Sequence, residues 1–222
     1  MEILLVVRNN SLINKHYNLL FNIVREKDKI IKIKDNDAKY NTLISKLLLH
    51  YYFQKNYNIS NFKIQRTRYN KPYIKNSNIH FNISHSKDLI VLAVNNSSIG
   101  IDVENITIFN YDIIKKFFSI KEEEYINSFS NNEKKKHEFF KLWTQKESFI
   151  KCIGKGFYHN ILDTNMVFNQ QKINKKNYNN NNYYFKTELV KKSFALSICS
   201  QYNLNNFNIT EISLEELIDF FI

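Results

Sequence analysis

The residues that allow unusual backbone geometry are confined to the middle of this chain of 222 residues. Its three glycines and its single proline all lie between residues 71 and 156, and so does its only tryptophan. Glycine permits backbone angles and close approaches that other residues cannot make, whereas proline fixes its own angle. We therefore expect the special turns and close contacts of the fold in this stretch, although a helix cap and an ordinary turn suffice to explain Gly154 and Gly156.

Length and composition indicate a globular protein. A chain of this length forms one large domain or two small ones packed together, and hydrophobic residues make up 43% of it, enough for a sizeable core. The apolar run after Glu2 predicts a core strand rather than a signal peptide, and no window approaches the ~18 apolar residues of a membrane helix. Two cysteines, Cys152 and Cys199, make no disulfide framework. We expect a cytoplasmic protein with reduced thiols.

The formal net charge of +11 indicates an acidic partner, such as nucleic acid, a membrane surface, a phosphate-rich ligand or an acidic protein. Charge alone does not choose among these classes. Lysine greatly outnumbers arginine, and asparagine and isoleucine are frequent. A compositional drift toward these residues therefore explains the positive excess equally well.

The hydrophobic pattern predicts a mixture of strands and helices. Strands are predicted at residues 3–7, 79–83, 89–94, 99–104, 163–168, 183–190 and 194–199. Helices are predicted at residues 37–53, 111–118, 133–153 and 213–221. A turn is expected at residues 84–88, and residues 172–182 are expected to form a polar, low-complexity loop at a hairpin tip. The order strand, helix, strands occurs once before about residue 105 and once after it, which suggests an α+β fold of two similar halves.

Two carboxylates share one face of the strand at residues 99–104. Because side chains alternate along a strand, Ile101 and Val103 face one side while Asp102 and Glu104 face the other. Mg²⁺ takes oxygen ligands, commonly one or two carboxylates together with phosphates of a substrate. The pattern therefore allows a magnesium site, although spacing alone favours an edge strand with a solvated acidic face.

The helix at residues 133–153 combines a broad apolar face with charged side chains. Trp143, Glu147 and Lys151 form a row four residues apart, for which a surface ion pair is the plain explanation. Lys146 projects into the middle of the apolar stripe. A buried lysine needs an acid, a phosphate or a route to the surface.

Two further segments have the composition of phosphate contacts. Ser84 and His85 follow a predicted strand, where a hydroxyl and an imidazole suit a phosphate group. Lys71 lies in a basic turn just before Pro72. Each segment is unremarkable alone, because such residues occur more often in turns than in functional sites.

Together these segments form an ordered set of motifs. They are Lys71-Pro72, Phe81 to Ser86, Ile99 to Glu104, Phe118-Ser119 with Glu122, Leu142 to Lys151, and Gly154 to Gly156. In this order and at these separations the chain resembles the Sfp-type 4′-phosphopantetheinyl transferases, over most of its length. The Gly-Ile-Asp-Val-Glu and Trp-x-x-Lys-Glu-Ser-x-x-Lys segments are specific as a pair.

The resemblance implies an α+β pseudo-dimer of two similar halves, residues 1–105 and 106–222, with the active site between them. Enzymes of this family transfer the 4′-phosphopantetheine arm of coenzyme A to a serine hydroxyl of an apo acyl or peptidyl carrier protein, release 3′,5′-ADP and require Mg²⁺. We accordingly expect a monomeric cytoplasmic transferase, a holo-[acyl-carrier-protein] synthase. It would serve fatty acid, polyketide or nonribosomal peptide biosynthesis, bind an acidic carrier protein, and engage neither nucleic acid nor membrane.

The resemblance also implies roles for individual residues. The ligands of Mg²⁺, together with the pyrophosphate of coenzyme A, would be Asp102, Glu104 and Glu147. Lys151 would contact the pyrophosphate, and Glu147 or Glu122, directly or through water, would take the proton from the carrier serine. The remaining contacts to coenzyme A would be made by Lys27, Thr42, Lys71, Ser84 and His85.

The sequence departs from the family pattern near the nucleotide contacts. The family has a basic residue shortly before the position of Lys27, and the corresponding residue here is Val24. The segment 28–41 also differs in length from the family pattern. Asn70 replaces the glycine that often precedes Lys-Pro, and asparagine tolerates the same left-handed turn.

Two other functions are compatible with parts of the sequence. A metal-dependent phosphodiesterase or nuclease would also use acidic residues, Mg²⁺ and lysine, and would not need coenzyme A. A basic RNA- or DNA-binding module could stack bases on Tyr and Phe interleaved with Lys. That module would leave the Asp102–Glu104 pair unexplained, because carboxylates repel phosphate.

Overall fold

The structure, a computed structural model, describes residues 1–156, 161–168, 174–204 and 207–222. The helices are α1 (Asn10–Ile23), α2 (Lys27–Ile31), α3 (Asn36–Tyr57), α4 (Tyr111–Phe117), α5 (Ile120–Asn127), α6 (Asn132–Ile153) and α7 (Leu214–Asp219), with a 3₁₀ turn, η2, at Ile161–Asp163. The strands are β1 (Glu2–Val7), β2 (Ile64–Arg66), β3 (Pro72–Ile74), β4 (His80–Ser86), β5 (Leu89–Asn95), β6 (Ile99–Asn105), β7 (Asn174–Tyr178), β8 (Asn181–Val190), β9 (Phe194–Ser200) and β10 (Asn208–Glu211).

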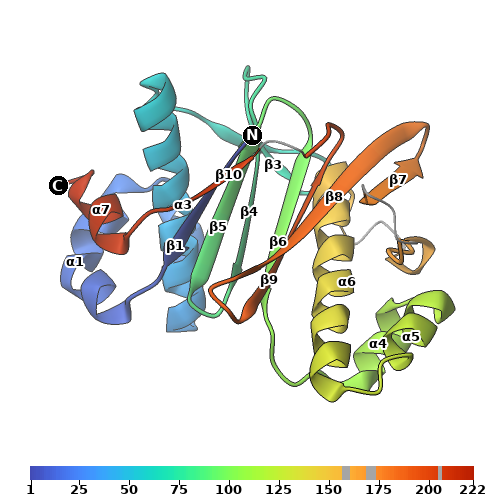
Figure 1. Cartoon of the computed structure of the whole chain (residues 1–222). Coiled ribbons are helices and arrows are strands. Elements are labelled where there is room, and N and C mark those ends of the chain that lie inside the picture. The colour runs from blue at the N-terminus through green and yellow to red at the C-terminus, as the bar shows by residue number, and fades with distance from the viewer. Residues whose placement is uncertain (157–160, 169–173, 205–206) are drawn as a thin grey trace.

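One arrangement of strands and helix occurs twice in the chain (Figure 1). The first large sheet has the strand order β10-β1-β5-β4, and the second has the order β6-β9-β8-β7. If β10 is left aside, the first strand of each sheet in sequence (β1 or β6) pairs antiparallel with the last (β5 or β9), and the last pairs antiparallel with the strand before it (β4 or β8). A helix of 22 residues, α3 or α6, lies between the first and second strands of each repeat. This repetition confirms the predicted α+β fold of two similar halves.

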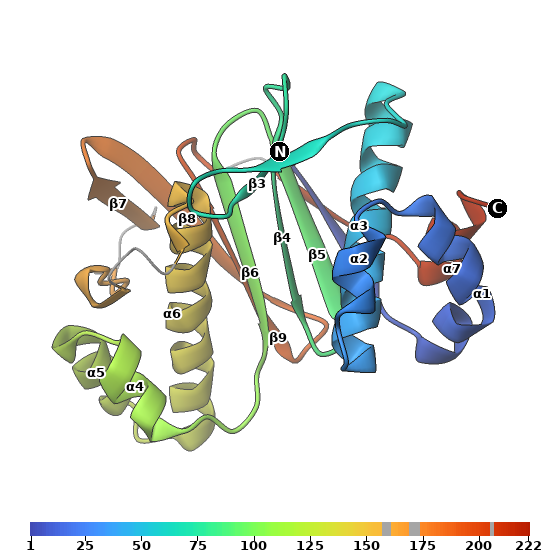
Figure 2. The same ribbon diagram turned by 180° about the vertical axis from the view of Figure 1, so that it is seen from behind.

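The two large sheets pack against each other between the two long helices (Figures 1 and 2). Leu4 of β1 and Leu92 of β5 belong to the core that includes α3, whereas Ile3 and Val91 lie in a core shared by both sheets. In the second half, Ile101 joins that shared core, while α6 packs on β6 and β9. Because β1 and β5 are buried on both faces, they have nearly continuous apolar sequences rather than alternating ones.

Both long helices are bounded by residues that satisfy their end groups. The Asp35 carboxylate accepts a hydrogen bond from the Ala38 amide at the start of α3, and Asn131 does the same for the Lys134 amide in α6. Helix α6 ends at Gly154, whose φ of +70° is the left-handed value common in helix C-caps. The predicted helix stop at Gly154 is therefore confirmed.

The C-terminal residues return to the first half. Strand β10 pairs parallel with β1, and α7 packs against α3 through Leu217 and Ile218. Strand β6, in contrast, belongs to the second sheet. The division into independent halves at residue 105 stays a prediction. No helix within the described residues is long and apolar enough to cross a membrane.

Several predicted elements are wrong. The expected turn at residues 84–88 is mostly strand, because β4 runs to Ser86 and only two residues separate it from β5. The expected hairpin tip at residues 172–182 is present but much shorter than predicted, since β7 and the start of β8 occupy most of this range and are joined through Asn179 and Asn180 at positive φ; residues 172 and 173 lie outside the described part. The expected strand at residues 163–168 is wrong, since η2 and irregular backbone occupy it. Elements α1, α2, α5, β2, β3 and β10 were not predicted. Four of them, α2, β2, β3 and β10, have five residues or fewer, whereas α1 has 14 residues and was missed despite its length.

Gly100 allows α6 to approach β6 more closely than any other residue would. A Cβ atom at this position would lie 1.9 Å from the Ser148 carbonyl oxygen and 2.4 Å from the Cys152 amide nitrogen. Both are backbone atoms of α6, so no side-chain rotation relieves the clash. The contact fixes the separation between Asp102, two residues further along β6, and Lys151 on α6.

We predict that Gly100→Ala lowers the free energy of unfolding by about 1–3 kcal/mol, because β6 and α6 must separate to admit a methyl group. Denaturant titration of the purified variant measures this change. Gly156→Asn is the control, since a Cβ there comes no closer than 3.6 Å to its nearest neighbour and asparagine tolerates the local φ of +52°. Equal losses in the two variants would contradict the role assigned to Gly100.

Candidate active site

Strand β6 presents carboxylates to helix α6. Ile101 and Val103 are fully buried between the sheets, so Asp102 and Glu104 point to the opposite side, as predicted. Asp102 is 3% exposed and Glu104 is half-buried. A solvated edge strand, the alternative explanation of this pattern, does not bury a carboxylate to this degree.

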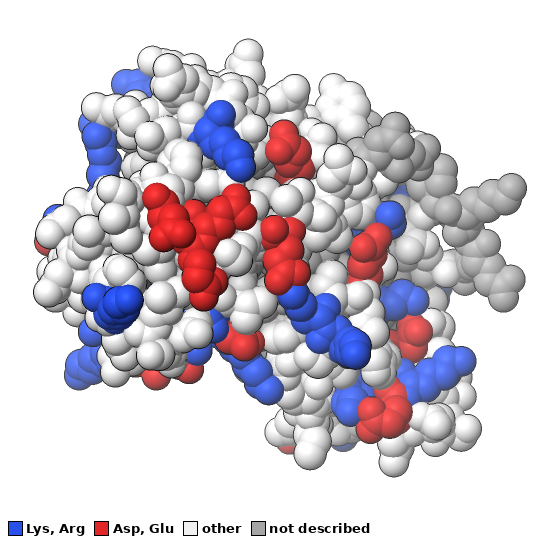
Figure 3. Space-filling view, turned by 60° about the vertical axis from the view of Figure 1, so that its left-hand side comes forward, with Lys and Arg blue, Asp and Glu red and all other residues white. Residues whose placement is uncertain are grey.

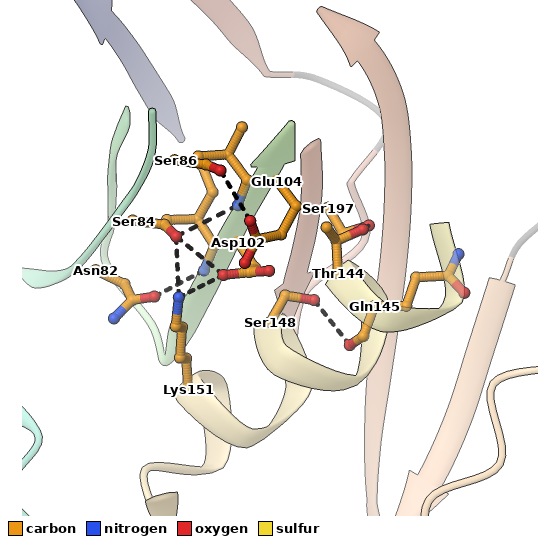
Figure 4. A network of polar contacts seen from close by, with 12 residues as sticks. Asn82, Ser84, Ser86, Asp102, Glu104, Thr144, Gln145, Ser148, Lys151 and Ser197 are labelled. Atoms are coloured by element: carbon orange, nitrogen blue, oxygen red, sulfur yellow. Dashed lines mark hydrogen bonds and ion pairs between the residues drawn. The ribbon is translucent and has the colours of Figure 1, made fainter. Parts of the chain in front are cut away.

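Helix α6 adds a third carboxylate, that of Glu147, and the ammonium group of Lys151. Lys151 Nζ lies 2.5 Å from Asp102 Oδ1 and donates a hydrogen bond of 3.0 Å to Ser84 Oγ (Figure 4). Glu147, one helical turn before Lys151, is half-buried and interacts electrostatically with Asp102 and Glu104. The structure therefore brings together Ser84, Asp102, Glu104, Glu147 and Lys151, which we call the carboxylate cluster.

Strand β4 holds β6 through side chains instead of through its backbone. Asn82 Oδ1 accepts a hydrogen bond from the Ile101 amide (2.8 Å), Ser84 Oγ from the Val103 amide (3.3 Å), and Ser86 Oγ from the Asn105 amide (3.1 Å). Two of the three hydroxyl or amide groups also reach the acids: Ser84 donates to Asp102 (2.9 Å) and Ser86 donates to Glu104 (2.8 Å), as Figure 4 shows.

Asn82 and Ser86 support the site through these hydrogen bonds, and the sequence analysis gave them no role. Their signal was a period of two, Asn82-x-Ser84-x-Ser86, which continues the strand beyond residue 83. The same period places Ser84 and His85 on opposite faces of β4, so the structure does not bring these two predicted phosphate contacts together. His85 is exposed, and desolvation and then Lys151 lower the pKa of its imidazole.

The three carboxyl groups resist ionisation together. Burial raises the pKa of Asp102 and outweighs its ion pair with Lys151. Burial and the neighbouring Asp102 raise the pKa of Glu104. The pKa of Glu147 is raised to about 6, chiefly by burial and then by Asp102. Mutual repulsion of this kind disappears when a cation is shared among the groups.

The carboxylate cluster fits a divalent cation. Asp102 Oδ2 is buried and has no hydrogen-bond partner among the described residues, although Oδ1 of the same group has two. Such an orphaned oxygen is costly unless a ligand satisfies it. Among the described residues, no group of three or more histidine, cysteine, aspartate or glutamate side chains is arranged so that it could hold a metal ion by itself. Mg²⁺ does not need such a group, because it takes one or two carboxylates, water and substrate phosphates.

Glu122 lies elsewhere. Its carboxylate Oε2 is 2.8 Å from Lys146 Nζ, and both side chains are 0% exposed. It also accepts hydrogen bonds from the amides of Ser119 (2.8 Å) and Met166 (2.9 Å). The buried lysine predicted from the sequence therefore has an acidic partner, and the structure does not bring Glu122 to the carboxylate cluster. Its contacts instead tie α5, α6 and residue 166 together.

The other predicted contacts to coenzyme A are engaged with the protein itself. Lys71 Nζ donates to the Ile99 carbonyl (3.1 Å) and the Cys152 carbonyl (2.9 Å), and burial lowers its pKa. Thr42 Oγ1 donates to the Ala38 carbonyl (2.8 Å), within α3. Lys27 Nζ donates to Asn22 (2.9 Å) and lies over the Phe21 ring. Lys71 thus reaches across to the start of β6 and the end of α6, whereas the hydrogen bonds of Thr42 and Lys27 stay within α3 and with α1.

Two family models match consecutive parts of the chain. The model described as 4'-phosphopantetheinyl transferase, N-terminal, matches residues 13–97, and that of the 4'-phosphopantetheinyl transferase superfamily matches residues 98–203. They meet in the turn between β5 and β6. Among curated proteins, the 4'-phosphopantetheinyl transferase gsp of Aneurinibacillus migulanus is 34% identical over 100% of this chain and 95% of its own length.

Further relatives carry related names. The 4'-phosphopantetheinyl transferase Sfp of Bacillus subtilis (strain 168) is 28% identical over 87% of this chain and 88% of its own. The solved structure of the holo-[acyl-carrier-protein] synthase of Thermotoga maritima matches with a TM-score of 0.33 and 14% identity, over 46% of this chain and 61% of that one.

We predict that Glu122→Ala lowers the free energy of unfolding by about 3–5 kcal/mol, because it leaves the Lys146 ammonium buried without a counter-charge. Denaturant titration measures the loss. The double variant Glu122→Gln/Lys146→Met is expected to recover much of it, since no charge is then buried. Glu133→Ala, which removes the surface ion pair with Lys136 at the start of α6, is the control and is expected to change little. An equally mild effect of Glu122→Ala would contradict this assignment.

Proposed function

The chain belongs to the 4′-phosphopantetheinyl transferase superfamily, and we propose that the carboxylate cluster is the place where it breaks the pyrophosphate of coenzyme A. The enzyme transfers the 4′-phosphopantetheine arm of coenzyme A to a serine hydroxyl of a carrier protein. The observation that carries the proposal is the buried Asp102 Oδ2, which has no hydrogen-bond partner among the described residues. Asp102 is one of three neighbouring carboxyl groups with raised pKa values, and Lys151 lies beside it.

The proposed metal ligands are Asp102, Glu104 and Glu147, together with the pyrophosphate. A bound Mg²⁺ would neutralise negative charge on the pyrophosphate and help to align it. The protein prepares this site with hydrogen bonds: Ser84 fixes one oxygen of Asp102 and leaves the other without a partner, and Ser86 fixes Glu104. These outer contacts orient the ligands before substrate arrives.

Lys151 is proposed to contact the pyrophosphate. Its ammonium is already at the carboxylate cluster, bound to Asp102 and Ser84, and its side chain remains 27% exposed. A partly open lysine at this position can add positive charge where negative charge develops on the leaving group. The leaving group would be 3′,5′-ADP.

Glu147 is proposed as the general base. It would take the proton from the carrier serine, whose oxygen attacks the β-phosphorus as the bond from that phosphorus to 3′,5′-ADP breaks. Before a cation binds, burial and Asp102 raise the pKa of Glu147 to about 6, so the side chain is largely ionised at neutral pH and can accept a proton. Glu122, the other residue considered for this role, has all its observed contacts inside the protein, which favours a structural role for it.

The nucleotide of coenzyme A is proposed to bind along Lys27, Thr42, Lys71, Ser84 and His85. The charge distribution supports this placement, because residues 38–87 contain nine lysines or arginines and no aspartate or glutamate. Ser84 belongs to the carboxylate cluster, and Lys71 binds the carbonyl of Ile99 at the start of β6, the strand that carries two of its carboxylates. Lys27 and Thr42 would exchange their present intramolecular partners for the ligand.

The carrier protein is proposed to be acidic, and the enzyme to work as a cytoplasmic monomer. The surface charge is uneven: Figure 3 shows acidic side chains gathered on the side of the molecule where α7 lies, and α7 itself exposes Glu215, Glu216 and Asp219. An acidic carrier would be repelled from that side. It would be attracted to the basic segment at residues 38–87.

The function is tested by weighing a carrier. We predict that an apo carrier protein incubated with this protein, coenzyme A and Mg²⁺ gains the mass of one phosphopantetheine, and that EDTA abolishes the gain. Glu147→Gln is expected to lower the rate by about 10²-fold or more, because a general base contributes on this scale. Glu188→Gln, on β8 and paired with Lys186, is the matched control and should leave the rate unchanged. Absence of both mass gain and coenzyme A binding would overturn the assignment.

Salt tests the proposed attraction. We predict that raising ionic strength at constant Mg²⁺ increases the KM for an acidic carrier, because exposed charges separated by more than about 10 Å are largely screened at 0.1 M salt. Steady-state kinetics over a salt series measures this. A carrier with its acidic side chains neutralised is expected to show a flatter dependence. A KM that stays constant for the acidic carrier would remove electrostatic steering from the account.

A further inference from the structure

The two cysteines of the chain lie on either side of Gly100. Cys199 of β9 is the Cα partner of Gly100 in β6, and partners in antiparallel strands are about 4.5–5.5 Å apart. A Cβ atom on Gly100 would also lie 3.0 Å from Cys152 Cα in α6. Both cysteines belong to the apolar core between α6 and the second sheet. Because glycine has no side chain to separate them, the two thiols are neighbours in this core.

The two thiols are free and differ in how readily they ionise. The Cys199 thiol, and then the Lys71 ammonium, lower the pKa of Cys152 although this residue is buried. Burial and then Cys152 raise the pKa of Cys199. The thiolate is the reactive form of cysteine, so Cys152 is the nucleophile of the pair. Cys199 is the thiol that can react with the Cys152 sulfur in a second step.

Cys152 lies where α6 can open locally. Only Ile153 separates it from the helix cap at Gly154. Its Sγ is 3.5 Å from the Ser98 carbonyl oxygen, in the turn between β5 and β6, and Ser98 is partly exposed. Helix ends open at little cost in free energy, and such an opening admits a small oxidant to Cys152. Cys199 is 0% exposed within β9, so its neighbour is the sulfur that an oxidant meets first.

A bond between the two sulfur atoms would act on residues of the active site. Cys152 directly follows Lys151, which contacts Asp102, and the Cys152 carbonyl accepts a hydrogen bond of 2.9 Å from Lys71. Helix α6 cannot move closer to β6 at Gly100, because the two backbones are already in contact there. When the sulfur atoms approach to bond, the last turn of α6 must therefore shift along the sheet and carry Lys151 with it.

We propose that Cys152 and Cys199 form a reversible disulfide by exchange with a low-molecular-weight disulfide such as oxidised glutathione, and that this bond slows the transfer reaction by displacing Lys151. Disulfides of cytosolic proteins are commonly transient and redox-sensing. The effect on transfer rests on the function proposed above, whereas formation of the bond does not.

The exchange takes place in two steps. The Cys152 thiolate attacks one sulfur of oxidised glutathione and releases one glutathione thiolate, which takes up a proton from water. The Cys199 thiol then loses its proton to water, and its sulfur attacks the Cys152 sulfur and releases the second glutathione. Two protein thiols are oxidised, and one oxidised glutathione is reduced to two thiols.

The bond is tested by equilibrating the folded protein in glutathione buffers of increasing oxidised fraction. Free thiols are then alkylated in denaturant and the protein is weighed. Since the chain has only two cysteines, a monomer that loses both alkylation sites without gaining glutathione contains this disulfide. The ratio of disulfide to dithiol should be at least about tenfold higher in the folded protein than in the protein unfolded in urea, because the fold holds the sulfur atoms together. An equal or lower ratio in the folded protein would overturn the proposal.

The rate of transfer tests the consequence. The oxidised protein should modify a carrier at least about tenfold more slowly than the reduced protein, since a displacement of about 1 Å is enough for this. Dithiothreitol should restore the rate. Cys152→Ala is the control, because it lacks the nucleophile and its rate should be the same in all glutathione buffers. Thermal unfolding shows whether this variant is folded, and Cys152→Ser replaces it if it is not.

Two outcomes would overturn the control of transfer by this bond: an unchanged rate in the cross-linked protein, or an equal loss of rate in folded Cys152→Ala. If the reduced protein itself modifies no carrier, the proposed function fails, and the ratio of disulfide to dithiol still decides whether the bond forms.

Discussion

The two halves of this protein depend on a ladder of hydrogen bonds in which the side chains of β4 replace a backbone partner for β6. One edge of β6 pairs with β9. On its other edge, the amides of Ile101, Val103 and Asn105 donate to Asn82, Ser84 and Ser86. Backbone amides buried without partners would cost about 1–3 kcal/mol each. The ladder therefore stabilises the junction between the sheets, and it also fixes the register of β6 relative to β4.

The same ladder controls the carboxylates. Each serine that accepts from a β6 amide also donates to the acid beside it, so Asp102 and Glu104 are held by the groups that join the halves. The acids cannot move without disturbing the junction. This arrangement keeps repelling, partly desolvated carboxyl groups close together, a state that costs stability in the absence of a cation. Of the three carboxyl groups, only Asp102 forms an ion pair with a described residue, Lys151, and its Oδ2 still has no hydrogen-bond partner there.

The sequence predicted the parts of the fold that depend on apolar periodicity. Helices α3 and α6 follow from a period of 3.6, strands β1 and β5 from continuous apolar runs, and the facing of Asp102 and Glu104 away from Ile101 from the alternation along β6. The sequence also showed that Lys146 needed a partner, but not that the partner is Glu122, because the contact joins residues whose proximity depends on how α5 packs on α6. Strand β4 was cut short at Ile83 because Ser84 and Ser86 look like turn residues until their partners on β6 are known.

Comparison of the repeated strands explains why only one half carries the acids. In β1, Leu4 and Val6 face α3 and belong to its apolar core. In β6, the corresponding positions facing α6 are Asp102 and Glu104, while Ile101 and Val103 face the other sheet just as Ile3 and Leu5 do. Strand β1 lies between β10 and β5, so both its edges are filled by backbone. Strand β6 has one edge free of backbone pairing, and polar side chains from β4 can enter there. The duplicated fold therefore accommodates carboxylates at the position where its second copy remains an edge strand.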